Sequence, residues 1–336
     1  MLTFGVEKQN WSGEPLWVLR GPQGSKAAIL PGIGANLVAL SLSPGNGETA
    51  VSVMSSPPDA RALREAPTRY GAPVLFPFPS RLAGGRFTYG GKEHQVDVYP
   101  DGNARHGFVT AAPFEFEAQG ASSKEAWVTF RFDGNTADIQ RQFPFPFVLK
   151  MTFRLDAEGL GVEIEGSNTG SKQMPMGFGW HPYFNMPLGP NGSRNACRLQ
   201  VPARKYWELS PAPDLVPTGK RPPVSGKMDM RAGIVVADNL YDDMFTDVER
   251  DAKEWTHAAL IDEVAGLKLG ISGGPTFREW VIYTPPERPA ICLEPYTCSG
   301  NALNLQAAGV DAGVQDIQPG ESWSDAMRVT LERLAR

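Results

Sequence analysis

The chain of 336 residues has few cysteines, no excess of positive charge and no long apolar run. Its three cysteines, Cys197, Cys292 and Cys298, cannot all pair with one another and form no C-x-x-C unit, which argues against a disulfide framework and a thiolate zinc site. The net charge of -5 argues against a general nucleic-acid binder, which would show a basic face. No stretch of roughly 18 apolar residues could span a membrane. Because residues 1–11 also lack the pattern of a signal peptide, we expect a soluble, reduced, cytoplasmic protein.

Proline and glycine are abundant, with 30 and 36 residues, whereas average chains contain roughly 5% and 7%. They are scattered along the chain, which is typical of many short strands joined by turns. Apolar residues alternate with polar ones most clearly at 149–155 and 160–165. A period of two is expected when an antiparallel sheet buries one face. About fifteen such strands predict an all-β fold built as one large antiparallel β-sandwich.

Helices and linkers are scarce. One early helix is predicted at Ala60 to Ala66, capped by Asp59 and ended by Pro67. The stretch 210–226 contains five prolines and is interpreted as a surface loop, with an active-site lid as the alternative. No interior boundary combines a linker with a change of composition, so residues 1–336 are predicted to form a single domain.

The most distinctive stretch is G-F-G-W-H-P-Y-F-N-M-P-L at 177–188. Its prolines forbid a long helix, so we expect His181 at the end of a strand, flanked by the flat rings of Trp180, Tyr183 and Phe184. An aromatic wall suits a sugar, whose C–H faces stack on rings, and an imidazole can move protons near neutral pH. A structural histidine in an aromatic core is the alternative.

Other polar residues occur in comparable settings. Glu294 directly follows the apolar run I-C-L, and partial burial would raise its pKa and make it a usable base; a salt bridge with an arginine is the alternative. His106 lies in the loop D-G-N-A-R-H-G-F, and Arg81 follows a proline-rich run, where a surface or ion-paired role is the alternative. Asp242 and Asp243 indicate metal or hydroxyl binding, although paired aspartates are common in turns.

A metal site must be weighed against these candidates. Two histidines and two carboxylates could form one, but the chain has no H-x-H or H-x-x-x-H spacing and the candidates are far apart in sequence. We therefore expect no catalytic transition metal.

Taken together, the motifs resemble those of the aldose 1-epimerase (galactose mutarotase) family, from about Ala35 to the C-terminus. The motifs are S-R-L-A-G-G-R-F at 80–87, N-A-R-H-G-F at 103–108, W-H-P-Y-F-N at 180–185, Y-D-D-M-F at 241–245, and C-L-E-P at 292–295 followed by N-A-L-N at 301–304. The resemblance implies the galactose mutarotase-like β-supersandwich. It also implies an isomerase that interconverts the anomers of a free hexose without a cofactor.

By this resemblance, Glu294 matches the general base of the family and His181 its general acid. His106 and Arg81 match residues that bind and polarise the sugar near its ring oxygen and hydroxyls, and Asp242 matches the aspartate that holds sugar hydroxyls. The implied partner is a small sugar, and either a monomer or a homodimer is compatible with the sequence.

Two departures from the family pattern concern the substrate. Ser80 stands where many members have asparagine, and Gly300-Asn301-Ala302 replaces P-D-A after a run from Glu294 that is one residue longer. Some relatives act on hexose 6-phosphates through arginines, and Arg81, Arg86 and Arg105 lie near the corresponding motifs. The motif at 80–87 resembles the branch for unphosphorylated sugars more closely.

Three alternatives to a free-hexose epimerase remain. A hexose-6-phosphate 1-epimerase would have a basic pocket. A non-catalytic sugar-binding protein on the same fold would not need both Glu294 and His181. A lyase or glycosidase would usually carry a helical domain, for which the chain has no run of helices.

Overall fold

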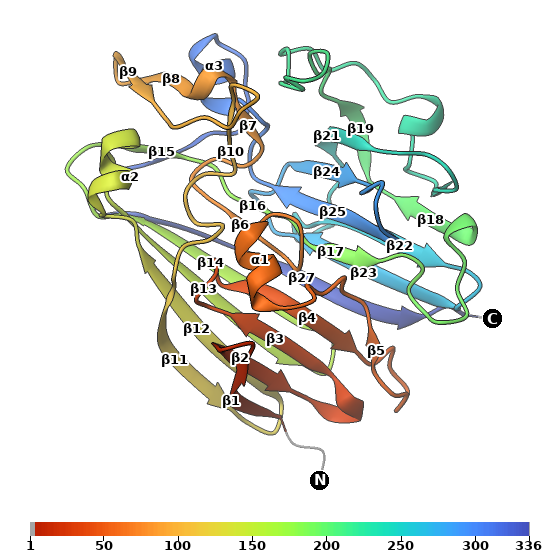
Figure 1. Ribbon diagram of the computed structural model, residues 1–336. Helices are drawn as coiled ribbons and strands as arrows, with labels where there is room; N and C mark the ends of the chain where they lie inside the picture. Colours follow the sequence, from red (N-terminus) through yellow and green to blue (C-terminus); the bar gives the residue numbers. More distant parts are fainter. Residues whose placement is uncertain (1–3, 336) are drawn as a thin grey trace.

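The computed structural model describes residues 4–335, which form mainly antiparallel strands in three larger sheets and three two-stranded ribbons (Figure 1). This confirms the prediction of an all-β antiparallel fold. No helix in residues 4–335 is long and apolar enough to cross a membrane.

The first sheet has five strands in chain order. Its strands are β1 (Gly5–Trp11), β2 (Glu14–Arg20), β3 (Lys26–Leu30), β4 (Asn36–Leu42) and β5 (Val51–Ser52). Helix α1 (Ala60–Glu65) follows, and a carboxylate oxygen of Asp59 accepts a hydrogen bond from the backbone N–H of Ala62 at 2.7 Å, as the predicted cap requires. Leu63 of α1 packs with Leu16 and Val18 of β2, so the helix covers one face of this sheet.

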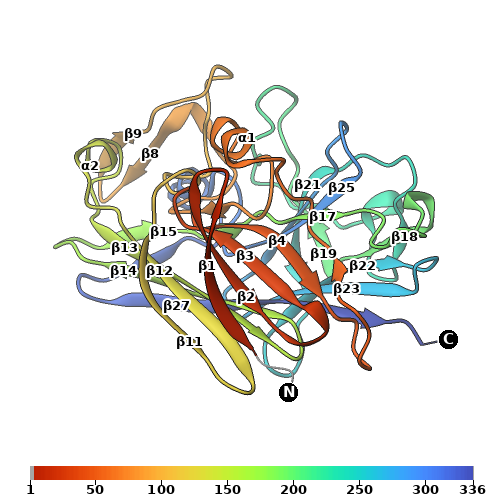
Figure 2. The ribbon, with the colours of Figure 1, turned by 60° about the horizontal axis from the view of Figure 1, so that its bottom comes forward.

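The second sheet has nine strands and forms the common base of the fold. In spatial order its strands are β11 (Glu115–Ala121), β12 (Glu125–Asp133), β13 (Phe147–Asp156), β14 (Leu160–Asn168), β27 (Ser322–Arg333), β23 (Leu267–Gly273), β22 (Thr256–Asp262), β18 (Cys197–Gln200) and β20 (Ile234–Val235). Residues 149–156 alternate between buried and half-buried positions, as the sequence period predicted. Trp17 of the first sheet stacks on Phe116 of β11 at 5.6 Å and meets Phe130 of β12 edge-on at 5.4 Å. The two sheets therefore share a core, and Figure 2 shows the first sheet in front of β12 and β13.

The third sheet has seven strands and carries the candidate site. Its strands are β6 (Val74–Leu75), β16 (Gly179–Trp180), β17 (Tyr183–Asn185), β19 (Ala203–Tyr206), β21 (Asp242–Val248), β24 (Glu279–Tyr283) and β25 (Ala290–Tyr296). The indole N–H of Trp280 on β24 donates to the hydroxyl oxygen of Thr256 on β22 at 3.0 Å. The nine-stranded sheet thus packs against this sheet as well, and one continuous apolar core joins all three.

The ribbons and the short helices lie around this core. The ribbons are β7 (Arg81–Leu82) with β10 (Ala104–Arg105), β8 (Arg86–Tyr89) with β9 (Lys92–Gln95), and β15 (Met174–Met176) with β26 (Gln315–Ile317). The remaining helices are α2 (Ala137–Gln142), α3 (Ala302–Ala307) and the 3-10 turns η1 (Pro22–Gly24), η2 (Ala83–Gly85), η3 (Arg194–Ala196) and η4 (Gly226–Met228). The sequence did not predict α2 or α3, each of which is six residues long.

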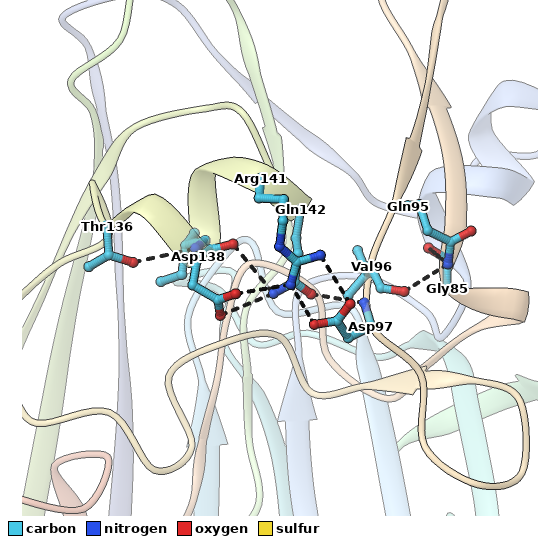
Figure 3. A network of polar contacts seen from close by, with 9 residues as sticks. Gly85, Gln95, Val96, Asp97, Thr136, Asp138, Arg141 and Gln142 are labelled. Carbon is cyan, nitrogen blue, oxygen red and sulfur yellow. Dashed lines mark hydrogen bonds and ion pairs between the residues drawn. The ribbon is translucent and has the colours of Figure 1, made fainter.

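A polar network fastens α2 to the chain that follows β9 (Figure 3). The guanidinium of Arg141 donates to both carboxylate oxygens of Asp97, at 2.6 and 3.2 Å, and to Asp138 at 2.9 Å. The side-chain carbonyl of Gln142 accepts from the backbone N–H of Asp97 at 2.8 Å. These contacts hold the start of the segment that leads to β10 and His106.

The proline-rich stretch 210–226 forms a hairpin that is exposed over much of its length. The backbone N–H of Ser210 donates to the carbonyl of Val216 at 2.8 Å, and that of Thr218 donates to the carbonyl of Glu208 at 2.8 Å. The five prolines are compatible with this hairpin because proline lacks a backbone N–H, and the N–H groups that donate here belong to other residues.

Candidate active site

The register of β25 brings its Glu294 opposite His181. The segment that contains β16 and β17 runs antiparallel to β25, and the pairs on either side of its interruption keep one register: Gly179 with Tyr296, and Tyr183 with Cys292. The same register places His181 across from Glu294. Opposed side chains on antiparallel strands share a face, with Cβ atoms about 5 Å apart. The His181 Nε2 atom accordingly lies 3.4 Å from Glu294 Oε1.

Aromatic rings pack against His181, but only one of the three rings that the sequence predicted is among them. The imidazole stacks on the Tyr183 ring with centroids 4.8 Å apart and planes at 14°, and Tyr283 approaches edge-on at 6.2 Å. Trp180 and Phe184 lie in the apolar core, because neighbouring residues of a strand face opposite sides. The predicted wall of Trp180, Tyr183 and Phe184 is therefore wrong in two of its three rings, and Tyr283 supplies the second ring.

Glu294 is 1% exposed, and its two carboxylate oxygens have different surroundings. The hydroxyl of Tyr296 donates to Oε2 at 2.5 Å, whereas Oε1 has no hydrogen-bond partner and faces His181. Burial raises the pKa of Glu294 well above its ordinary value, and the Tyr296 hydrogen bond partly opposes this by stabilising the carboxylate. The titratable group beside this carboxyl is His181, and no arginine of residues 4–335 lies within ion-pair distance of it.

Burial has the opposite effect on the two histidines. It lowers the pKa of His181 to about 3, and the positive charge of Arg288 adds to the effect. Burial, followed by the charges of His181 and Arg81, also lowers the pKa of His106 well below its ordinary value. Because burial disfavours both charged forms, the pair favours the arrangement in which its shared proton lies on the Glu294 carboxyl group and the His181 imidazole is neutral. The imidazolium–carboxylate form contains the same single proton.

A pair of short strands carries Arg81 and places His106. Arg81 of β7 lies opposite Arg105 of β10, and the backbone N–H of His106 donates to the carbonyl of Ser80 at 2.9 Å. Gly107 follows at φ +69°, where a Cβ would lie 1.9 Å from a backbone oxygen of Phe76. Only glycine fits this close approach, which explains why glycine follows His106 in the motif N-A-R-H-G-F.

The N-A-L-N motif fastens the loop after Arg81. The backbone N–H of Asn301 donates to the carbonyl of Arg81 at 2.7 Å, and its side-chain oxygen accepts from the N–H of Ala83 at 3.2 Å. The side-chain amide of Asn304 donates to the carbonyl of Arg86 at 2.8 Å. Motifs more than 200 residues apart in sequence thus form one structural unit.

The two neighbouring aspartates face opposite sides of the sheet. Asp242 lies opposite Tyr283 of β24, and its carboxylate oxygen is 3.8 Å from a guanidinium nitrogen of Arg81. Asp243 lies opposite Ile282, whose side chain is in the core. Asp242 therefore faces the candidate site, whereas Asp243 does not.

A cavity of about 210 Å³ lies in front of these residues. Its lining consists of Thr68, Arg69, Ser80, Arg81, Arg105, His106, His181, Tyr183, Asp242, Val281, Tyr283, Glu294 and Tyr296. All five predicted site residues are present, and no lining residue comes from 210–226 within the described chain. Tyr296, Tyr283 and Arg69 also line the cavity, although they were not among the predicted site residues. Tyr296 alone had a local signal, because it follows Glu294 by two residues on a strand and so shares its face.

Several residues that line the cavity contain buried polar atoms without a hydrogen-bond partner in the described chain. These atoms are Arg81 Nε, Arg105 Nε, His106 Nδ1, His181 Nδ1 and Glu294 Oε1. Buried polar groups are normally hydrogen-bonded, so this concentration indicates a site for a polar ligand. One acid, one base and an arginine beside them can exchange protons with a hydroxylated molecule and stabilise charge on its oxygen atoms.

Comparisons with known proteins identify the family of this chain. The family model described as Aldose 1-epimerase matches residues 15–330. The chain is 28% identical over 133 residues to the uncharacterized protein YphB of Escherichia coli K12, covering 40% of this chain and 41% of that protein. It is 26% identical over 210 residues to galactose mutarotase of Mus musculus, covering 62% and 58%. Both matches span less than two thirds of the relative's length.

A solved structure confirms the predicted fold. The galactose mutarotase-like protein from Clostridium acetobutylicum superposes with a TM-score of 0.89 over 99% of both chains, at 23% sequence identity. The galactose mutarotase-like architecture implied by the sequence motifs is therefore the architecture of this chain.

Proposed function

The chain belongs to the aldose 1-epimerase family, and we propose that it interconverts the α and β anomers of a free hexose in the cavity around Glu294 and His181. The observation that carries this proposal is the buried pair itself. A carboxyl group and an imidazole face each other at 3.4 Å, at the wall of a cavity that fits a small polar molecule.

The proposed reaction needs one proton acceptor and one proton donor. Glu294 as carboxylate takes the proton from the anomeric O1 hydroxyl, while His181 as imidazolium gives one to the ring oxygen. The C1–O5 bond breaks, C1 rotates about its bond to C2, and the reversed transfers close the ring on the other face. Each transfer of this kind typically accelerates a reaction roughly 10²- to 10⁴-fold. No electrons or groups leave the sugar, so the reaction requires no cofactor.

The proton that the pair already shares supplies the acid. In the free site burial favours the neutral form. Sugar hydroxyls that donate to Glu294 would stabilise its carboxylate, and the shared proton would then reside on His181. Arg81 and His106 would hold the ring oxygen and neighbouring hydroxyls, with Asp242 accepting from a further hydroxyl.

Polarimetry tests the proposal on freshly dissolved α-D-glucose and α-D-galactose. Wild type is expected to speed the approach to equilibrium, and Glu294→Gln to remove at least about 10²-fold of the enzymatic rate. Glu279→Gln is the matched control, since Glu279 is equally buried on the adjacent strand β24 but does not line the cavity.

The outcomes separate the hypotheses. A mutant as fast as wild type would contradict the acid–base assignment. Sugar binding without any acceleration, measured by calorimetry, would favour the non-catalytic binding protein.

A second candidate substrate is a hexose phosphate, and the arginines of the cavity favour it. Arg69, Arg81 and Arg105 line one small space, and the charge of Arg81 adds to burial in lowering the pKa of Arg105. Arg69 forms no ion pair with an acid among the described residues. Arg81 already pairs with Asp242 and Arg105 with Asp101, so Arg69 is the cation that a phosphate on the substrate would compensate.

Exchange rates measured by NMR for glucose and glucose 6-phosphate distinguish the two substrates. If the phosphate is recognised, Arg69→Ala should lower kcat/KM for the phosphorylated sugar about tenfold and leave glucose nearly unaffected. Arg86→Ala is the matched control, because Arg86 is exposed, bonds to Gln95 and lies outside the cavity lining. An equal loss for both sugars would argue against phosphate recognition.

A further inference from the structure

We propose that Cys292, Glu294 and His181 form an inhibitory site for zinc at the wall of the cavity. One potential ligand atom from each residue, a thiol sulfur, a carboxylate oxygen and an imidazole nitrogen, lies within 4.8 Å of the other two. The inhibitory effect depends on the proposed epimerase activity, whereas zinc binding itself does not.

Strand register explains why the thiol joins the pair. Cys292 and Glu294 are two residues apart on β25, so their side chains share a face. Cys292 lies opposite Tyr183 on one side and Tyr283 on the other, and packs with both rings beside the cavity. His181 precedes Tyr183 by two residues and occupies the same face. The sequence showed no metal motif because two of the three ligands belong to one strand and the third to a distant one.

The ligand atoms are buried and partly without partners. Glu294 is 1% and His181 7% exposed, and Glu294 Oε1, which faces His181 Nε2 at 3.4 Å, has no hydrogen-bond partner. Ligand atoms of a tetrahedral zinc site lie about 3.5 Å apart, so shifts of roughly 1 Å would close the site. A buried cluster that close already requires little reorganisation to bind an ion.

The donor set favours zinc over the commoner hard cations. Sulfur, nitrogen and oxygen donors together suit Zn²⁺, whereas Mg²⁺ and Ca²⁺ prefer oxygen ligands alone. A thiolate and a carboxylate balance the two charges of the ion, so the complex is neutral in a buried site. Binding releases the thiol proton and the proton of the Glu294–His181 pair to solvent.

Zinc in this position blocks the proposed reaction. The ion occupies lone pairs of Glu294 and His181, which can then neither accept the O1 proton nor protonate the ring oxygen. Inhibition is expected to be reversible by a chelator, because no covalent bond is formed.

Direct binding is measured on protein first stripped with EDTA. X-ray absorption of the zinc complex should show one sulfur at about 2.3 Å. Cobalt(II) should give thiolate charge-transfer absorption in wild type and in Cys298→Ser, a matched control at another buried free cysteine. Calorimetry should show zinc affinity at least about tenfold weaker in Cys292→Ser. X-ray absorption that shows no sulfur among the zinc ligands of wild type would overturn the site, and this result needs no variant. Equal zinc affinities of Cys292→Ser and wild type would overturn it as well.

Activity then tests the consequence. Equimolar zinc should slow mutarotation by wild type and Cys298→Ser at least about tenfold, with recovery on adding EDTA and no effect of magnesium. In the presence of equimolar zinc, Cys292→Ser should keep most of the rate that the same variant shows without metal. Zinc bound through sulfur without loss of rate would overturn the inhibitory role. If no sugar is turned over while zinc still binds through sulfur, the proposed function fails and the metal site stands.

Discussion

Removing the Tyr296 hydroxyl is expected to slow the proposed reaction and to shift its pH dependence in one defined direction. Tyr296→Phe keeps the buried ring and deletes the hydrogen bond at 2.5 Å to Glu294 Oε2. Hydrogen bonds to charged groups contribute about 1.5–3 kcal/mol. Because the carboxylate form loses this stabilisation, its share of the proton-sharing pair falls, and kcat should decrease roughly ten- to a hundredfold.

The pH profile distinguishes this effect from a general structural defect. The Tyr296 hydrogen bond lowers the pKa of Glu294, so its loss raises that pKa further. The pair is active while it holds one proton, and the rate is lost as the pH rises through the upper pKa of the pair. The alkaline limb of kcat/KM should therefore move to higher pH in Tyr296→Phe.

The assay is polarimetry across the pH range, with a chelator present so that adventitious zinc does not contribute. Tyr241→Phe is the control, since it removes a buried hydroxyl that donates to the backbone carbonyl of Lys227, away from the cavity. That variant should keep both the rate and the profile. An unchanged plateau rate in Tyr296→Phe, or an alkaline limb at lower pH, would refute the reasoning.

The neighbouring aspartates provide a paired test. Asp242→Asn should raise KM for the sugar severalfold, whereas Asp243→Asn, on the other face of the sheet, should leave the sugar kinetics unchanged. Equal effects of the two variants would contradict the register between β21 and β24. Burial raises the pKa of Glu279 from 4.5 to about 7, so the folded state binds the extra proton between these values. The free energy of unfolding should fall by up to about 3 kcal/mol as the pH rises from 4.5 to 7, and Glu279→Gln should flatten this dependence in urea unfolding. Gly107→Ala should destabilise the fold by more than about 2 kcal/mol, because a Cβ would lie 1.9 Å from a backbone oxygen. Gly102 also has a positive φ but lies in open space, so Gly102→Ala should cost only about 1 kcal/mol. Equal midpoints of the two variants in thermal unfolding would argue against the close contact.

Local pattern was sufficient for much of the fold. Alternation at 149–155 predicted a half-buried antiparallel strand, and Asp59 and Pro67 predicted α1 nearly to the residue. Helix α3 was missed because it lacks the local signals of α1: the residue before it, Asn301, has φ +54° and makes no side-chain cap. Short helices of this kind depend on tertiary contacts, which local propensity does not contain.

The aromatic residues around His181 could be predicted only in part. The sequence indicates that Trp180, Tyr183 and Phe184 are near the histidine, but not that the interruption between β16 and β17 leaves only Tyr183 on its face. That choice depends on pairing with β25, more than 100 residues later in the chain.

The sequence by itself determined the class of fold and the residues that can exchange protons, because a period of two and the chemistry of Glu294 and His181 are local properties. Only the tertiary structure decided which atoms meet. It placed Glu294 against His181, brought Tyr296, Arg69 and Cys292 to the same site, and turned Asp243 away from it. These relations follow from the register between strands that are distant in sequence, and register is set by the packing of the whole core.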